Sequence, residues 1–501
     1  MWRMLALMFV GAVLPVSAQT PCERLKSVIL PEATVTLVES AAAGPYRPPG
    51  APTESQPLAL PACCRVALTL KPSADSDIKA EVWLPEAADW NGKILMAGGG
   101  GFVGYLSYGA MAAALREGYA TASTDTGHEG GDASFALGHP EKVVDFAYRA
   151  VHETTVKTKA IVAAYYGRGA RFSYWQGCST GGRQGLMEAQ RYPEGFDGII
   201  AVAPANNQIQ LCAWRMLVVA ASLKDPGRAL TVAKNALLNR AVLDACDALD
   251  GVKDRLLADP RNCHFNPATL LCRGPEQDDC LTAGQLETVK MAYSDARKHD
   301  GELIYPRLPP GGELGWRLPG QGKEPGSIDV GMFRFIAHQD PSWDWRTFDL
   351  DRDTALAQER AGFMEATSTD LSAFKARGGK LLIYHGWNDG GSGGAISALN
   401  SIAYYESVLT RMGPDQKGWL RLFLVPGMAH CGGGPGPNQF SALAALERWC
   451  ESGMAPDRIV AAKVIDGRVE MTRPLCPYPQ VAVYSGVGSI NDEGNFACKA
   501  P

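Results

Sequence analysis

The chain has 501 residues, of which 46% are hydrophobic and 20% charged, a composition typical of a globular protein with a large core. A formal net charge of −5 argues against nucleic acid as a partner, because contacts with phosphate groups require a basic surface. Length alone allows two or three domains, or one large α/β domain that carries an insertion.

The N-terminus has the pattern of a signal peptide over residues 1–18. Arg3 supplies the positive charge, residues 5–14 the apolar segment, and Val16-Ser17-Ala18 the small-residue cleavage site. A buried N-terminal helix is the alternative. The apolar segment is too short to span a bilayer and no longer one follows, so we expect no membrane partner. The 13 cysteines are typical of an oxidising compartment, and we expect a secreted or periplasmic protein.

Predicted strands and helices alternate from residue 66 to residue 202, and again after residue 371. The predicted strands are 66–70, 78–84, 93–97, 119–123, 171–175, 198–202, 380–384 and 420–425. The predicted helices are 108–116, 141–166, 183–191, 371–376 and 395–411. This alternation predicts an α/β fold with a parallel central sheet and helices on both faces.

Residues 206–366 interrupt the alternation. They form a long, irregular segment rich in Cys, Asp, Trp and Pro. We therefore expect a lid domain over 206–366, inserted into a catalytic domain made of 19–205 and 367–501. Active sites of parallel sheets lie in the loops at the carboxyl ends of the strands, so an insertion there would cover the site.

A predicted strand, the sequence Gly177-Cys178-Ser179-Thr180-Gly181 and a predicted helix follow one another. Together they match the nucleophile elbow of α/β-hydrolases. The sharp turn needs small flanking residues, and the N–H groups at the start of the helix stabilise negative charge. We predict that Ser179 is the nucleophile of a serine esterase.

The partners of Ser179 follow from the chain order of this fold, which is serine, acid, histidine. His430 comes after the last predicted strand and is the predicted base; Asp389 comes after the strand before it and would orient His430. A turn-forming aspartate is the alternative for Asp389, because only Gly and Ser fill the next five positions. The histidines set aside precede Ser179, lie in the insertion or precede the acid: His128, His139, His152, His264, His299, His338 and His385.

Acyl transfer also needs N–H donors for the oxyanion. One should be the backbone N–H of Thr180, directly after the nucleophile. The other should come from the glycine run 98–101 in the loop after an early strand, from Gly100 or Gly101. A flexible turn is the alternative for this run.

Cysteines stand beside two of the predicted site residues. Cys178 precedes Ser179 and Cys431 follows His430. A disulfide between them would hold the two loops at a fixed separation and so preorganise the site.

The predicted lid contains an aspartate-rich turn between Cys246 and Cys263. Carboxylates of Asp247, Asp250 and Asp254, with carbonyl groups of Val252 and Leu256, would offer the oxygen ligands that Ca²⁺ prefers. A solvated acidic turn is the alternative, since the spacing differs from that of an EF-hand. The distance in sequence from Ser179 indicates a structural ion.

Several segments of the chain resemble the tannase and feruloyl esterase family, which includes mono(2-hydroxyethyl) terephthalate hydrolases. The resemblance covers nearly the whole chain after residue 19 and rests on residues 60–66, 81–85, 90–93, 124–128, 138–142, 177–182 and 473–479. It implies a disulfide between Cys178 and Cys431 and a calcium site in the lid. The other bridges that it implies are Cys246–Cys263, Cys272–Cys280, Cys476–Cys498 and Cys22–Cys64, with Cys63 as the alternative partner of Cys22. Cys212 and Cys450 stay unassigned.

The chain departs from the family pattern after Asp389, where members often have an apolar residue and Pro and this chain has Gly390-Gly391-Ser392-Gly393-Gly394. Specificity carried over from relatives is therefore open at that loop.

Three functions are consistent with the sequence. The first is hydrolysis of esters of aromatic acids, of hydroxycinnamic or gallic type, with a small-molecule substrate held against lid aromatics. The second is hydrolysis of a terephthalate monoester, whose carboxylate would need a lid cation. The third is a non-catalytic carbohydrate-binding protein on the same fold. The aromatics are Trp214, Trp316, Phe333, Phe335, Trp343 and Trp345, each of which could instead be lid core; the cations are Arg215, Arg307, Arg317 and Arg334.

Overall fold

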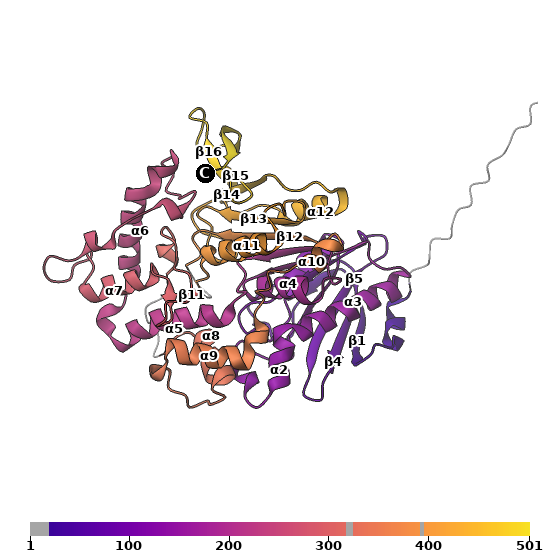
Figure 1. The fold of residues 1–501 in the computed structure, drawn as a ribbon. Coiled ribbons are helices and arrows are strands. Elements are labelled where there is room, and N and C mark those ends of the chain that lie inside the picture. The colour runs from indigo at the N-terminus through magenta and orange to yellow at the C-terminus, as the bar shows by residue number, and fades with distance from the viewer. Residues whose placement is uncertain (1–19, 317–323, 391–394, 501) are drawn as a thin grey trace, which may run out of the picture.

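The computed structural model describes residues 20–316, 324–390 and 395–500 (Figure 1). The predicted signal peptide lies outside the described residues, as do Arg317 and residues 391–394 of the loop after Asp389. Within the described ranges, no helix is long and apolar enough to cross a membrane.

A nine-stranded sheet forms the centre of the molecule, in the order β1-β4-β5-β7-β6-β8-β9-β12-β13. The first four strands in this order pair antiparallel and the remaining pairs are parallel, so the sheet is mostly parallel. Its strands are β1 (Ala33–Ala41), β4 (Cys63–Leu70), β5 (Ile78–Pro85), β6 (Lys93–Ala97), β7 (Ala120–Thr124), β8 (Phe172–Cys178), β9 (Gly198–Val202), β12 (Lys380–Gly386) and β13 (Leu420–Val425). The α/β-hydrolase fold expected from the sequence is therefore confirmed.

Alternate side chains of the parallel strands enter two separate cores. On β8, Trp175 packs with helices α3 (Ala150–Tyr166), α4 (Thr180–Arg191) and α11 (Ala398–Met412), while Tyr174 faces α1 (Tyr108–Arg116) and α12 (Ala442–Ser452). Both faces of the sheet are thus covered by helices. This explains why central parallel strands such as β6 and β9 consist almost entirely of apolar residues.

Shorter elements complete this part of the chain. Its remaining helices are α2 (Pro140–Val144) and α10 (Ser372–Ala376), and its two-stranded sheets are β2 (Gly44–Tyr46) with β3 (Leu58–Leu60), β14 (Ile459–Ile465) with β15 (Arg468–Leu475), and β16 (Val481–Tyr484) with β17 (Phe496–Lys499).

The segment between β9 and β12 adds no strand to the central sheet, and its helices lie to one side of the sheet in Figure 1. It enters and leaves at one point, where the Ala366 N–H donates to the Asn206 carbonyl at 2.8 Å. Its elements are α5 (Gln208–Lys224), α6 (Val232–Cys246), α7 (Ala283–Ala292), β10 (Ala296–Arg297), β11 (Leu303–Tyr305), α8 (Ser327–Gly331) and α9 (Leu350–Ala361).

The irregular structure expected for this segment is wrong, because much of it is helical. Helix α5 shows why the sequence pattern did not predict these helices. It is buried around most of its circumference, by Trp214 and Met216 among others, so its sequence lacks an alternation of apolar and polar faces.

The described residues contain five disulfides, and they are the five implied by the family resemblance: Cys22–Cys64, Cys178–Cys431, Cys246–Cys263, Cys272–Cys280 and Cys476–Cys498. Cys63, Cys212 and Cys450 are free thiols.

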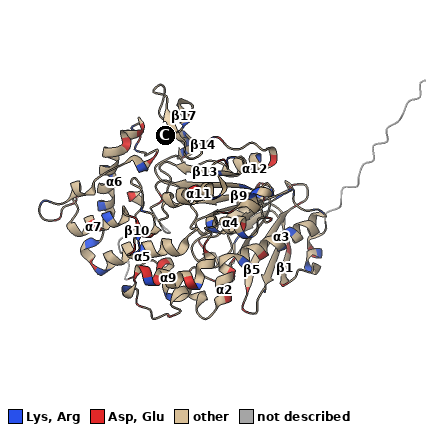
Figure 2. Cartoon of the chain, viewed as in Figure 1, with Lys and Arg blue, Asp and Glu red and all other residues tan. Residues whose placement is uncertain are grey.

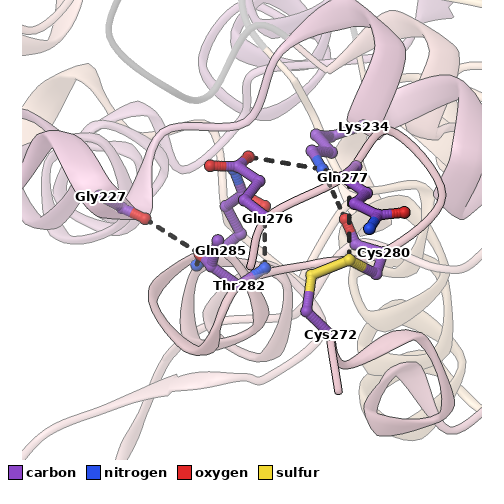
Figure 3. Close-up of a disulfide and its surroundings, with 8 residues drawn as sticks. All are labelled: Gly227, Lys234, Cys272, Glu276, Gln277, Cys280, Thr282 and Gln285. Carbon is purple, nitrogen blue, oxygen red and sulfur yellow. Dashed lines mark hydrogen bonds and ion pairs between the residues drawn. A yellow bond between two sulfur atoms is a disulfide. The ribbon is translucent and has the colours of Figure 1, made fainter. Parts of the chain in front are cut away.

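Figure 3 shows the disulfide Cys272–Cys280 of the inserted segment, which has the shortest sequence separation of the five bridges. The Lys234 ammonium donates to the Gln277 and Cys280 carbonyl groups, and Thr282 and Gln285 form a capping box at the start of α7. The bridge thus closes a short loop before α7, and Lys234 holds this loop against α6. Figure 2 shows acidic and basic residues interspersed over the whole cartoon.

Candidate active site

Ser179 lies in a strained turn between β8 and α4. Its φ of 61° and ψ of −118° are unusual for a residue with a side chain, and hydrogen bonds hold it there. The Ser179 N–H donates to the Val202 carbonyl at 2.9 Å, and the Ser179 carbonyl accepts the Ala205 N–H at 3.1 Å. The end of β9 therefore fixes the turn that carries the Ser179 hydroxyl.

Glycines are required where this turn meets its neighbours. A Cβ atom on Gly177 would lie 2.5 Å from the Gly181 carbonyl group, and one on Gly181 would lie 2.9 Å from the Gly99 oxygen. Side chains at these positions would push the strand, the helix and the glycine run apart.

Asp389 and His430 are joined by a hydrogen bond of 2.7 Å between Asp389 Oδ2 and His430 Nδ1. Asp389 is buried in the loop after β12, and His430 lies in the loop after β13. Burial alone would raise the pKa of Asp389, but the charge of His430 and hydrogen bonds from His385 and His430 hold that pKa below its ordinary value. The carboxylate is therefore ionised beside the imidazole.

The disulfide between Cys178 and Cys431 places the serine and histidine loops side by side. The Cα atoms of the two cysteines are 5.8 Å apart. A ring nitrogen of His430 lies within 4.8 Å of both sulfur atoms. The Asp389–His430 hydrogen bond and this disulfide thus place the loops of Asp389 and His430 beside the turn that carries Ser179.

The glycine run lies against the start of α4. The Gly181 N–H donates to the Gly99 carbonyl at 2.7 Å, and the Thr180 hydroxyl donates to the Gly101 carbonyl at 2.8 Å. Gly101 has a φ of +57°, and a Cβ there would lie 3.2 Å from Ile328 of α8. Within the described residues, Gly100 has no hydrogen-bond partner, so its N–H is available to a ligand.

A second loop supports the glycine run. His128 Nε2 lies 3.1 Å from the Phe102 carbonyl, and the Thr126 hydroxyl donates to the Val103 carbonyl at 2.6 Å. The segment directly after the glycines is therefore held by residues of the motif Thr124–His128.

Sequence reasoning missed His385, the sixth residue of β12. Its Nε2 lies 3.1 Å from Asp389 Oδ2, and its ring is fully buried. The rule of chain order set it aside as a base, but a histidine inside a buried apolar strand needs polar partners. The position of His385 in a predicted apolar strand was therefore the feature of the sequence that could have indicated a polar partner nearby.

The aspartate-rich turn contains three carboxylates, those of Asp247, Asp250 and Asp254. Burial, and to a smaller extent the neighbouring carboxylates, raises the pKa of Asp250 and of Asp254. Arg473 donates to Asp254 at 2.6 Å, whereas Asp247 Oδ1 is buried without a hydrogen-bond partner in the described structure. A buried carboxylate oxygen without a partner calls for a cation or a water, and carboxylate oxygens are ligands that Ca²⁺ prefers, so the chemistry of these side chains fits a Ca²⁺ site.

The lid aromatics form its core. Phe335 is partly buried and the others are buried, namely Trp214, Trp316, Phe333, Trp343 and Trp345. Three of the four arginines predicted as lid cations are described, and each faces a carboxylate: Arg215 faces Asp329, Arg307 faces Asp295 and Arg334 faces Glu324.

Known proteins share both the sequence and the fold. A family model described as tannase and feruloyl esterase matches residues 64–499. An uncharacterized esterase of Xanthomonas campestris pv. campestris is 38% identical over 98% of this chain and 93% of its own. A mono(2-hydroxyethyl) terephthalate hydrolase of Piscinibacter sakaiensis is 36% identical over 97% of this chain and 93% of its own. The crystal structure of feruloyl esterase B from Aspergillus oryzae matches with a TM-score of 0.89 and 32% identity over 95% of this chain and 99% of that one. The chain therefore belongs to the tannase and feruloyl esterase family.

Proposed function

We propose that the protein is a secreted serine carboxylic ester hydrolase that cleaves esters of aromatic acids through an acyl-enzyme. The observation that carries this proposal is the hydrogen bond between Asp389 and His430, in a loop that a disulfide joins to the strained turn of Ser179. A binding protein without catalysis would not require this arrangement.

In the proposed reaction, Ser179 Oγ attacks the acyl carbon of the ester while its proton passes to His430 Nε2. Asp389 accepts the Nδ1–H of His430 and so fixes the tautomer whose Nε2 is free to take that proton. The oxyanion is held by the N–H groups of Thr180 and of Gly100 or Gly101.

Collapse of this intermediate breaks the bond to the alcohol oxygen, and the alcohol leaves with the proton from His430. Water then attacks the acyl-enzyme with the same help from His430 and releases the acid and Ser179.

The substrate class is proposed from the relatives. One is named as a feruloyl esterase and one as a mono(2-hydroxyethyl) terephthalate hydrolase, so an aromatic acyl group is common to both. A hydroxycinnamic or gallic acyl group carries no second carboxylate. A terephthalate monoester carries one, and Arg215, Arg307 and Arg334, the described candidates for binding it, already face carboxylates of the chain. This favours the hydroxycinnamic or gallic type, with the terephthalate monoester as the second candidate.

The proposed calcium ion would be bound by the carboxylates of Asp247, Asp250 and Asp254 and the carbonyl groups of Val252 and Leu256. When bound it would neutralise the turn and hold it rigid, with no part in acyl transfer. The partner-free oxygen of Asp247 supports this assignment. The disulfides of the chain support an extracellular or periplasmic location.

A fluorophosphonate probe tests the proposal, because it reacts only with an activated serine. We expect it to label wild-type protein at Ser179 and to leave the Ser179→Ala variant unlabelled. Wild-type protein that resists the probe would contradict the esterase assignment and favour a binding protein. The ratio of kcat/KM values on methyl ferulate, methyl gallate and a terephthalate monoester then ranks the acyl groups.

A further inference from the structure

Asp389 receives hydrogen bonds from two histidines on one oxygen. Its Oδ2 lies 2.7 Å from His430 Nδ1 and 3.1 Å from His385 Nε2, while its Oδ1 accepts the Ile396 N–H at 3.2 Å. The proposed mechanism uses only the first of these three contacts.

The contacts of His385 show which of its nitrogens carries the proton. Its Nε2 faces two acceptors, Asp389 Oδ2 and the Ile396 carbonyl, each at 3.1 Å. A bare nitrogen there would oppose two oxygen lone pairs, so Nε2 must be protonated. Its Nδ1 lies 2.8 Å from the Ser401 hydroxyl, which can donate to it. A neutral ring with its proton on Nε2 therefore satisfies every contact.

We propose that His385 is a positioning residue for the reaction, whose Nε2–H keeps the buried Asp389 carboxylate ionised and directed at His430. This inference rests on the proposed function, since it assigns His430 as the base. A buried carboxylate has no water to stabilise its charge, so each fixed donor matters. Ser401 in α11 in turn fixes the tautomer of His385.

Other groups near this cluster do not replace His385. From the lid, the Tyr305 hydroxyl accepts the Ser397 N–H at 3.3 Å, and burial raises the pKa of Tyr305, so it stays neutral. The buried Arg215 beside Tyr305 is bound to Asp329. His430 and His385 are thus the side chains that hydrogen-bond to Asp389 in the described structure.

The test compares two variants, His385→Leu, which removes the donor, and His385→Gln, whose amide N–H can replace it. Without the donor, the Asp389–His430 pair binds its proton more tightly, and His430 becomes a competent base only at higher pH. We expect the acid limb of the kcat/KM profile of His385→Leu on methyl ferulate to move upward by about one pH unit. The limb of His385→Gln should stay near that of the wild type.

Loss of packing alone would lower kcat at every pH and leave the acid limb in place, and that result would overturn the inference. Nitrogen-15 spectra of histidine-labelled wild-type protein give a second test that needs no folded Leu variant. We expect His385 to be neutral with its proton on Nε2, and a proton on Nδ1 alone would refute the assignment. An inactive wild type that also resists the fluorophosphonate would instead refute the proposed function, so the two failures are distinguishable.

Discussion

At the scale of single residues, the ionised carboxylate of Asp389 determines the tautomer of His430. We expect Asp389→Asn to lower kcat on methyl ferulate by about 10⁴-fold with little change in KM, because the amide favours the tautomer that cannot accept the serine proton. Steady-state kinetics with titrated active sites provide the measurement. A loss below tenfold would show that Asp389 is only a turn residue.

The glycine run offers a second prediction at this scale. A Cβ on Gly98 would lie 2.7 Å from the Gly181 Cα and 2.8 Å from the Trp175 ring, whereas one on Gly100 would meet nothing within 4 Å. We expect Gly98→Ala to lower the thermal unfolding midpoint by several degrees, since overpacking costs about 1–3 kcal/mol. Gly100→Ala, the matched control, should unfold like the wild type. Equal midpoints for the two variants would contradict this view of the packing.

The sequence was sufficient to predict the pairing of Asp389 with His430, because His430 is the histidine that follows the last predicted strand and Asp389 follows the strand before it. It was not sufficient for His385, whose contact with Asp389 depends on how the loop after β12 turns back toward that strand. The local sequence does not predict that this loop turns back toward β12. Only the burial of a polar ring in an apolar strand indicated that a partner exists.

At the scale of elements, the Cys178–Cys431 bridge joins the end of β8 to the loop after β13. We expect the double variant Cys178→Ser/Cys431→Ser to lose activity and about 2–5 kcal/mol of stability, since the bridge closes a long loop. Cys272→Ser/Cys280→Ser is the matched control. It opens a bridge with a sequence separation of 8 rather than 253, and it should keep full kcat. Activity on methyl ferulate and chemical denaturation of both proteins make the comparison, and equal kcat values would mean that the active-site bridge is dispensable for positioning.

Among the elements, the sequence patterns predicted most strands and helices of the sheet region up to β13. Short apolar runs bounded by glycine can only be buried strands there, as for β6, β9 and β12. The elements after β13, namely α12 and the hairpins β14–β15 and β16–β17, were not predicted, and two further kinds of element were missed. Strand β1 lies at an edge and is mostly half-buried or exposed, so it lacks a continuous apolar run. Helices such as α5 are buried on several sides and lack a polar face.

At the scale of the whole molecule, the aspartate-rich turn of the proposed calcium site links the inserted segment to the β14–β15 hairpin, since Arg473 of β15 donates to Asp254. We expect a chelator to lower the thermal unfolding midpoint of the wild type and added Ca²⁺ to restore it. Asp247→Asn should be insensitive to both. A midpoint that is unchanged by chelation would indicate a solvated acidic turn in place of a metal site.

The short connection between the inserted segment and the sheet also bears on how freely the sequence of this segment can vary. The segment begins directly after Ala205, whose N–H bonds to Ser179, and it closes with the hydrogen bond between Ala366 and Asn206. The residues that hold the serine turn, Val202 and Ala205, lie outside this segment, so the segment can vary except where it contacts the rest of the chain, as Tyr305 and Asp254 do. The segment therefore has the geometry of an exchangeable cassette, and grafting one from a relative at this junction would transplant acyl preference onto an intact catalytic base.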